Sequence, residues 1–105
     1  MSFVRVCGVD DVQPESAVSV SVGGVAVAVV RDGDEWYAIY DECSHAAIPL
    51  SEGEVEGDQI ECWLHGSMFD LRTGKPTNLP ATEPVAIYPV KVEGDDVLVD
   101  VHAPY

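Results

Sequence analysis

Two short runs of the sequence each pair a cysteine with a histidine. The first contains Cys43 and His45, and the second contains Cys62 and His65. A thiolate is a soft metal ligand and a neutral imidazole is a borderline one, so four such groups brought together predict a zinc site or an iron–sulfur site. The chain holds three cysteines and three histidines in all. These two runs therefore use most of its residues of either type.

The order of the ligands along the chain bears on which centre they form. Zinc modules usually pair Cys with Cys and His with His, whereas each run here carries one of each. The mixed order lets each run give a thiolate to one iron and an imidazole to the other. It therefore favours a 2Fe–2S centre with two cysteine and two histidine ligands. A structural zinc site with the same four ligands is the alternative.

The residues around these ligands resemble the paired cluster loops of Rieske-type ferredoxins. The similarity runs from about Ile39 to Val101, and the first 35 or so residues share only the strand pattern of that family. The segments that carry the resemblance are Cys43-Ser44-His45-Ala46, Leu50-Ser51-Glu52-Gly53, Cys62 to Asp70, Leu71-Arg72-Thr73-Gly74, Pro80-Ala81 and Tyr88 to Val92. The resemblance implies one Rieske 2Fe–2S cluster, with Cys43 and Cys62 on the buried iron and His45 and His65 on the outer iron.

The resemblance also suggests roles for residues next to the ligands. Ser67 matches the position from which high-potential Rieske proteins donate a hydroxyl hydrogen bond to a bridging sulfide. Phe69 stands where those proteins have a tyrosine, and Ile48 and Leu64 stand where they have the cysteines of a disulfide. The resemblance therefore implies a low-potential ferredoxin whose potential is raised somewhat by Ser67.

Three further features near the ligands each allow a functional and an ordinary interpretation. Trp63 either shields the cluster, forms part of a docking patch, or simply packs. The segment Asn78-Leu79-Pro80 resembles the third loop that covers the cluster in this family, or it is a plain surface turn. Acidic residues between the cluster loops either guide a basic partner or form a solvated face. These residues are Glu52, Glu54, Glu56, Asp58 and Glu61.

Composition predicts a small, folded and strongly acidic protein. With 105 residues, of which 47% are hydrophobic, the chain is expected to form one domain over residues 1–105. The formal net charge of −14 repels phosphate backbones, so nucleic acid is not an expected partner. The same charge favours a partner with a basic docking face. Solubility and adaptation to a salty cytoplasm are the alternative explanations.

The sequence indicates a cytoplasmic protein without a membrane partner. No signal peptide is visible, and the longest apolar run, Val25–Val30, is too short to span a bilayer. Two of the three cysteines are assigned to the cluster, and Cys7 has no obvious partner, as is typical of a reducing compartment. We expect an acidic monomer.

The periodic segments of the chain predict strands, and none has the spacing of a helix. Valine and serine alternate through Val18–Val22, and Gly23-Gly24 supplies a tight hairpin turn. Pro89 indicates an edge or a bulge in its segment. The expected strands are Phe3–Val6, Val18–Val22, Val25–Arg31, Glu35–Tyr40, Gln59–Cys62, Met68–Asp70, Val85–Val92 and Val97–Val101.

These strands predict an all-β fold with antiparallel pairing. Residues 1–40 and 81–105 are expected to form a small sandwich or barrel, which is the base of the molecule. Residues at about 41–80 are expected to form a cluster-binding lobe inserted in that base. This arrangement is also what the resemblance to the Rieske family implies.

The resemblance implies an electron carrier without a catalytic site of its own. Rieske oxygenase catalytic subunits add a mononuclear iron held by two histidines and a carboxylate, but only His102 remains here after His45 and His65. The sequence also lacks a Gly-x-Gly-x-x-Gly fingerprint for a dinucleotide. The leading hypothesis is a ferredoxin that passes electrons from a flavin-dependent NAD(P)H reductase to a terminal oxygenase, with both partners docking near His45 and His65.

Three alternative functions stay open from the sequence. Similar small Rieske proteins accompany iron–sulfur assembly machinery, where the cluster serves maturation or redox sensing. The small subunit of assimilatory nitrite reductase is a further relative of this family. A zinc-stabilised binding module is the alternative from a different class, and it would be colourless.

Overall fold

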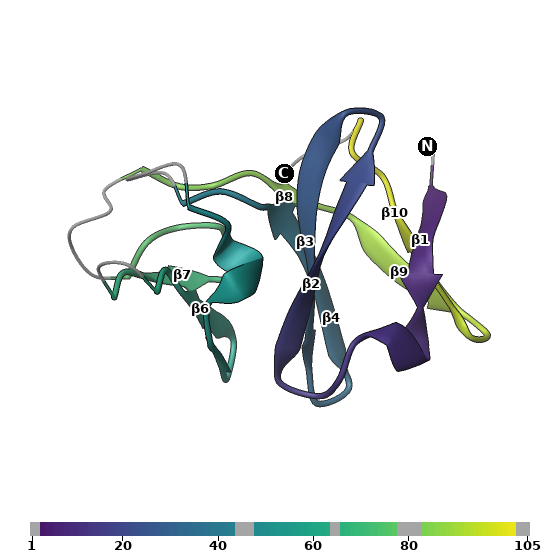
Figure 1. Cartoon of the computed structure of the whole chain (residues 1–105), viewed down its shortest axis with the longest axis horizontal. Helices are drawn as coiled ribbons and strands as arrows, with labels where there is room; N and C mark the ends of the chain where they lie inside the picture. Colours follow the sequence, from purple (N-terminus) through teal and green to yellow (C-terminus); the bar gives the residue numbers. More distant parts are fainter. Residues whose placement is uncertain (1–2, 44–47, 64–65, 78–82, 103–105) are drawn as a thin grey trace.

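The computed structural model describes residues 3–43, 48–63, 66–77 and 83–102. In these ranges the chain forms three antiparallel β-sheets and two single-turn 3-10 helices (Figure 1). The all-β prediction and the antiparallel pairing are therefore confirmed. No helix among these residues is long and apolar enough to cross a membrane.

The largest sheet has four strands in the order β2-β3-β4-β8. Its three long strands follow one another along the chain as hairpins. At the first turn, Gly23 and Gly24 both take positive φ angles, which a tight hairpin turn requires. Val27 to Val30 in β3 are fully buried. The strands are β2 (Ser16–Val22), β3 (Val25–Asp32), β4 (Glu35–Tyr40) and β8 (Ile87–Tyr88).

The second sheet joins the two ends of the chain. Its order is β1-β10-β9, so β1 from the N-terminal part lies beside β10 from the C-terminal part (Figure 1). These strands are β1 (Val4–Gly8), β9 (Val90–Glu93) and β10 (Asp96–Val99), and the 3-10 helix η1 (Val9–Asp11) follows β1. We refer to this sheet and the four-stranded sheet together as the base.

The third sheet lies at the opposite end of the molecule from β1 (Figure 1). Its strands are β5 (Val55–Glu56), β6 (Gln59–Glu61) and β7 (Met68–Asp70), in that order. The 3-10 helix η2 (Leu50–Glu52) precedes it and contacts β2 and β3 of the base. We refer to residues 41–77 as the lobe.

The strand predictions fail most clearly at the single strand expected over Val85–Val92. In the structure, β8 ends at Tyr88 and pairs with β4, whereas β9 begins at Val90 and pairs with β10. Pro89 separates the two strands. Proline has no N–H to donate to a ladder, so the chain leaves one sheet and enters the other at this residue. The two-residue strand β5 was not predicted.

Candidate cluster site

The two predicted cysteine ligands lie together in the interior of the lobe. Cys43 follows β4 and is 2% exposed, and Cys62 directly follows β6 and is 0% exposed. Both belong to one apolar cluster that also contains Leu50 and Phe69 of the lobe and Ile39 of the base. Neither cysteine is part of a disulfide. The structure therefore brings together two thiols that are nineteen positions apart in the sequence.

The remaining predicted ligands lie beyond what the structure describes. His45 and His65 are outside the described residues, as is Pro80 of the predicted covering loop. Both histidines, however, fall within short loops whose ends are described. These ends show how the backbone starts and closes each loop.

A backbone hydrogen bond from each cysteine closes the loop that follows it. The Cys43 N–H donates to the Ile48 carbonyl at 2.8 Å, and the Cys62 N–H donates to the Ser67 carbonyl at 2.7 Å. The Gly66 N–H donates back to the Cys62 carbonyl at 2.8 Å, and Gly66 has φ +75°, which favours glycine. The two cysteines thus begin matching loops, and each loop contains one predicted histidine.

The side chains that flank the second cysteine divide between interior and surface. Ser67 and Phe69 are completely buried, so the hydroxyl of Ser67 is held in the same interior as the thiols. Phe69 fills its position without a hydroxyl group. Trp63 is 49% exposed although it directly follows the buried Cys62. Of the interpretations given to Trp63, simple interior packing is therefore the one that fits least.

The backbone at Gly53, directly after η2, packs against the end of β6, the strand that precedes Cys62. A Cβ atom at Gly53 would lie 1.6 Å from the carbonyl oxygen of Glu61, the residue before Cys62. No side chain fits at that distance. The glycine of the Leu50-Ser51-Glu52-Gly53 run is therefore required by the close approach of its backbone to the residue before Cys62.

A buried aspartate near the first cysteine is the site feature that sequence reasoning missed. Asp41 is 6% exposed and accepts hydrogen bonds from both the N–H and the hydroxyl of Ser51. In the sequence, an aspartate at the end of a strand is indistinguishable from an ordinary turn residue. A serine ten residues later is no signal either, because only the fold brings the two together.

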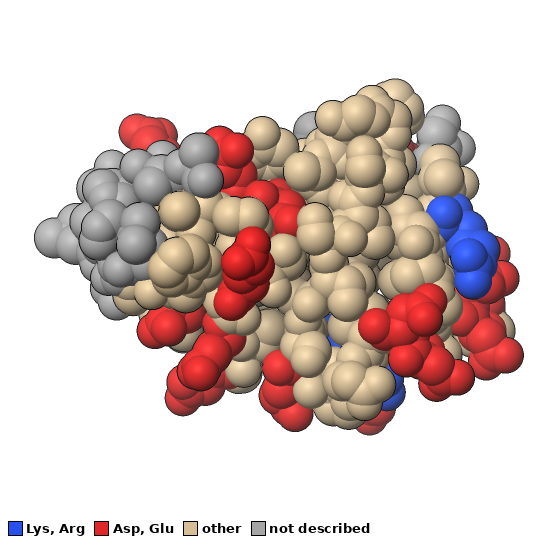
Figure 2. All heavy atoms as spheres, in the orientation of Figure 1, with Lys and Arg blue, Asp and Glu red and all other residues tan. Residues whose placement is uncertain are grey.

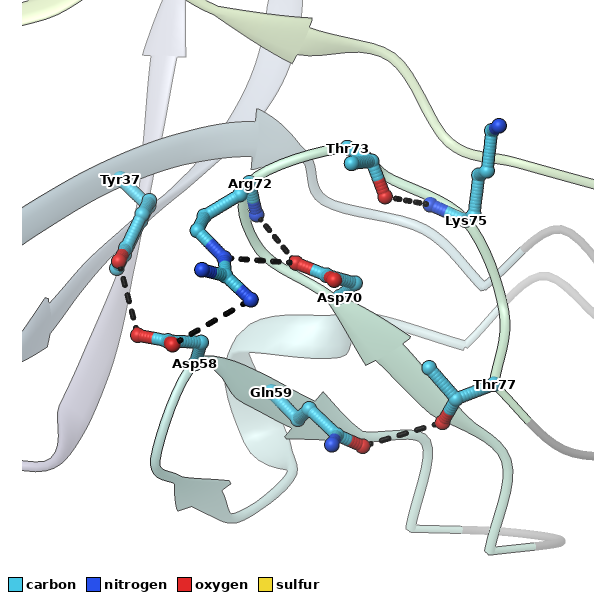
Figure 3. Close-up of polar contacts among 8 residues, drawn as sticks. All are labelled: Tyr37, Asp58, Gln59, Asp70, Arg72, Thr73, Lys75 and Thr77. Carbon is cyan, nitrogen blue, oxygen red and sulfur yellow. Dashed lines mark hydrogen bonds and ion pairs between the residues drawn. The ribbon is translucent and has the colours of Figure 1, made fainter.

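Polar contacts join the lobe to β4 of the base, next to the apolar cluster that contains both cysteines (Figure 3). The Tyr37 hydroxyl donates to Asp58 at 3.1 Å, and the Arg72 guanidinium lies 3.7 Å from Asp58 and 3.6 Å from Asp70. The pKa of the Tyr37 hydroxyl is raised to about 12, mainly because the group is partly removed from water and secondly because it donates a hydrogen bond to Asp58. These contacts do not touch the cysteines.

Two hollows on the described surface are lined by other residues than the two cysteines. One, of about 260 Å³, runs between β4, β8 and the Leu71–Arg72 turn, and another of about 260 Å³ lies beside β1 at the far end of the base. Neither is lined by Cys43 or Cys62.

The donor chemistry of the described residues fits an iron–sulfur cluster. Two thiols that are free of disulfides face a common apolar interior, where a thiolate–iron bond is shielded from water. Within the described ranges, no group of three or more Cys, His, Asp or Glu side chains forms a complete metal site. His45 and His65, the two other predicted ligands, lie outside these ranges.

Comparison with known proteins agrees with this fit. The sequence model of the Rieske [2Fe-2S] domain matches residues 2–89. The biphenyl dioxygenase ferredoxin subunit of Pseudomonas sp. (strain KKS102) is 44% identical over 101 residues, which cover 95% of this chain and 93% of that protein.

Two solved structures of similar proteins share the fold. The ferredoxin of carbazole 1,9a-dioxygenase from Nocardioides aromaticivorans IC177 matches with a TM-score of 0.88 and 44% identity, over 94% of this chain and 97% of that one. A complex of reduced oxygenase and oxidized ferredoxin in carbazole 1,9a-dioxygenase contains a chain that matches with a TM-score of 0.85 and 41% identity, over 92% of this chain and 91% of that one.

Proposed function

The chain belongs to the Rieske [2Fe-2S] domain family, and on that premise we propose that it is the ferredoxin component of a dioxygenase system. The observation that carries the proposal is the similarity to a dioxygenase ferredoxin subunit over nearly the full length of both chains. The protein binds a Rieske-type 2Fe–2S cluster and carries electrons one at a time. It is an electron carrier and not the catalytic subunit.

We assign the cluster ligands to Cys43, His45, Cys62 and His65. Burial of the two cysteines and the matching loop closures support this assignment. When bound, such a cluster supplies a one-electron redox couple, and two imidazoles in place of two thiolates make it easier to reduce than an all-cysteine cluster. Within the single domain at 1–105, the lobe, together with residues up to about 80, holds the cluster, and the base supports the lobe.

The residues around the ligands hold the thiols in place and exclude water from them. Leu50 and Phe69 are fully buried in the apolar cluster that contains both cysteines. The backbone bonds from each cysteine fix the direction in which its loop leaves the core. A site held rigidly in this way needs little rearrangement when an electron arrives or leaves.

We propose that the terminal oxygenase and a flavin-dependent NAD(P)H reductase dock over the two loops that contain His45 and His65. The half-exposed Trp63 supports this location, because aromatic side chains that remain accessible are enriched at protein interfaces. Acidic side chains are spread over the face shown in Figure 2, around the lobe as well as the base, and they favour basic partners at either end. We place the carrier in the cytoplasm, where free cysteines are stable.

Reconstitution of the electron chain tests the proposed function. The purified protein, loaded with its cluster, is mixed with NADH, the flavin-dependent reductase of a biphenyl dioxygenase system, its terminal oxygenase and biphenyl. We expect bleaching of the cluster only when the reductase is present, and product formation only when this protein is present. The proposal would be contradicted if the oxygenase formed no product, either with the reductase present or when the cluster-loaded protein is reduced chemically.

Substitution of Trp63 tests the proposed docking surface. The Trp63→Ala variant is expected to raise the KM of the oxygenase for reduced ferredoxin while the reduction potential stays at the wild-type value. Val92→Ala is the matched control, because Val92 is 40% exposed on β9 at the other end of the molecule. Equal KM values for both variants would exclude the docking surface but leave the function as an electron carrier unaffected.

A further inference from the structure

The segment that carries the first cysteine begins at a buried carboxylate. Asp41 directly follows β4, and its N–H donates to the Ala26 carbonyl of β3 at 3.0 Å, so its backbone is anchored to the base. Two extended residues span at most about 7 Å, which keeps the Asp41 backbone close to that of Cys43. Asp41 therefore lies where the rigid sheet ends and the cluster loop starts.

Both oxygens of this carboxylate are used by one residue of the lobe. The Ser51 N–H donates to Oδ1 at 2.7 Å, and the Ser51 hydroxyl donates to Oδ2 at 2.8 Å. Hydrogen bonds to a carboxylate are shorter and stronger than hydrogen bonds between neutral groups. The pair therefore closes the segment from residue 41 to residue 51 firmly, outside the smaller loop that the Cys43–Ile48 bond closes.

Ser51 connects Asp41 to the buried interior of the lobe. It belongs to η2, whose first residue, Leu50, is completely buried in the cluster that contains both cysteines. Gly53, directly after η2, packs against the backbone of Glu61. Asp41 thus holds Ser51 of η2. Leu50 of η2 shares the buried cluster with both cysteines, and Gly53 after η2 lies against the residue before Cys62.

Burial of the Asp41 carboxylate costs free energy, because the group loses most of its contact with water. The chain already carries a net charge of −14, and reduction adds a further negative charge to the region of Cys43. A serine or asparagine would close a turn without burying a charge. The advantage of a carboxylate is its capacity to accept two charge-assisted hydrogen bonds at once from a single residue.

We propose that Asp41 is a positioning residue for the cluster, acting through Ser51 to hold the loop of Cys43 in one geometry. This inference rests on the proposed cluster-binding function. Asp41 does not bind the cluster itself. Its role is to keep the first loop and η2 in register, so that the ligand geometry is retained and the loop does not open to release iron.

Two variants and one control test this role. Asp41→Asn removes the double acceptor, and Ser51→Ala removes only the hydroxyl donor. Asp100→Asn is the control, because Asp100 is also buried, at 1% exposure, and accepts the His102 N–H, but it lies after β10 in the base. Each protein is loaded with iron and sulfide, and the loss of visible absorbance is followed in the presence of an iron chelator.

We expect both lobe variants to lose the cluster faster than the wild type. Residues that support metal ligands typically affect metal retention about 10- to 100-fold, and Asp41→Asn should fall in this range. Ser51→Ala should show a smaller acceleration, because its N–H still donates to Asp41. Asp100→Asn should release its cluster at the wild-type rate even if its Tm is lowered.

The EPR spectrum of the reduced proteins separates positioning from loss of stability. We expect shifted g values in Asp41→Asn and Ser51→Ala, and wild-type g values in Asp100→Asn. Wild-type cluster lifetime and g values in Ser51→Ala would overturn the inference, whether or not Asp41→Asn folds. If the wild-type protein itself failed to bind a cluster, the proposed function would be wrong instead.

Discussion

The base and the lobe are built from the same kind of element but are stabilised in different ways. In the base, β2 and β3 are seven and eight residues long and pair without interruption. In the lobe, the strands are two or three residues long. A ladder that short contributes few hydrogen bonds. The lobe therefore depends on individual contacts, such as those of Asp41, Gly53 and the two cysteines.

This difference separates stability from ligand geometry. The base has regular alternation and an apolar core of its own, which includes Val27, Val97 and Val99. Many side chains share that function, so the loss of one contact is tolerated. On the proposed ligand assignment, the lobe holds four ligands in one arrangement, and it does so with short strands and a few individual contacts among its described residues. Substitutions in the lobe should therefore affect the cluster more than their effect on overall stability suggests.

The largest expected effect is that of Gly53→Ala. The new methyl group would overlap the Glu61 carbonyl. Overpacking typically costs about 1–3 kcal/mol and occasionally more, and a backbone carbonyl cannot move aside as a side chain can. We expect a lower Tm and loss of the cluster within the time of purification, with the strand signal in far-ultraviolet circular dichroism largely retained from the base.

Gly57→Ala is the matched control for this prediction. Gly57 also lies in the lobe and has φ +60°, but a Cβ atom there would meet nothing within 4 Å. The left-handed backbone alone costs about 1–2 kcal/mol. A Gly53→Ala protein that keeps its cluster as well as Gly57→Ala does would show that the close approach of the two segments is unimportant.

A smaller effect is expected where base and lobe are joined by Tyr37. Tyr37→Phe removes the hydrogen bond to Asp58 and should lower the free energy of unfolding by about 1 kcal/mol at neutral pH. The cluster should keep its wild-type EPR spectrum, because this contact lies away from the cysteines. Urea unfolding and EPR on the same preparation check both statements.

The pH dependence of the same variant gives an independent test. The pKa of Tyr37 is raised from 10 to about 12 in the folded protein, so the folded chain retains this proton at higher pH than the unfolded chain does. The stabilisation is present below pH 10 and is lost as the pH rises to about 12. Burial also raises the pKa of Tyr88, so part of the loss will persist. Tyr37→Phe should lose less stability than the wild type across this interval, and equal losses would contradict the assignment.

The smallest structural change with a defined electronic effect is Phe69→Tyr. Phe69 is fully buried in the apolar cluster that contains both cysteines, and it lacks a hydroxyl group. A tyrosine at this position adds a donor near the ligand sulfurs, and hydrogen bonds to sulfur favour the reduced cluster. We expect a higher reduction potential with little change in Tm. An unchanged or lower potential would remove the basis for describing this protein as a low-potential ferredoxin.

Much of the base could be predicted from the sequence, because its strands follow local rules. Glu35–Tyr40 was predicted with the observed bounds, and the hairpin at Gly23 and Gly24 follows from residues that tolerate positive φ. The sequence did not show that the chain changes sheets at Pro89. A proline reveals where a ladder is interrupted but not which partner strand comes next.

The lobe was predictable in its chemistry and less so in its construction. Cysteine spacing and family resemblance predict Cys43 and Cys62 as ligands, and the structure buries both in one apolar cluster. The role of Asp41 was not visible, because it depends on a serine that only the folded chain brings within hydrogen-bonding distance. Gly53 appeared as part of a motif, but the reason for a glycine there is the nearby backbone of Glu61.

The most direct test of the central claim is the EPR spectrum of the dithionite-reduced protein, with iron and acid-labile sulfide measured on the same sample. A 2Fe–2S cluster with two cysteine and two histidine ligands should give a rhombic signal, whose average g value lies below that of plant-type ferredoxins, at two irons and two sulfides per chain. An EPR-silent, colourless protein that contains one zinc per chain would contradict the account and leave a metal-stabilised binding domain.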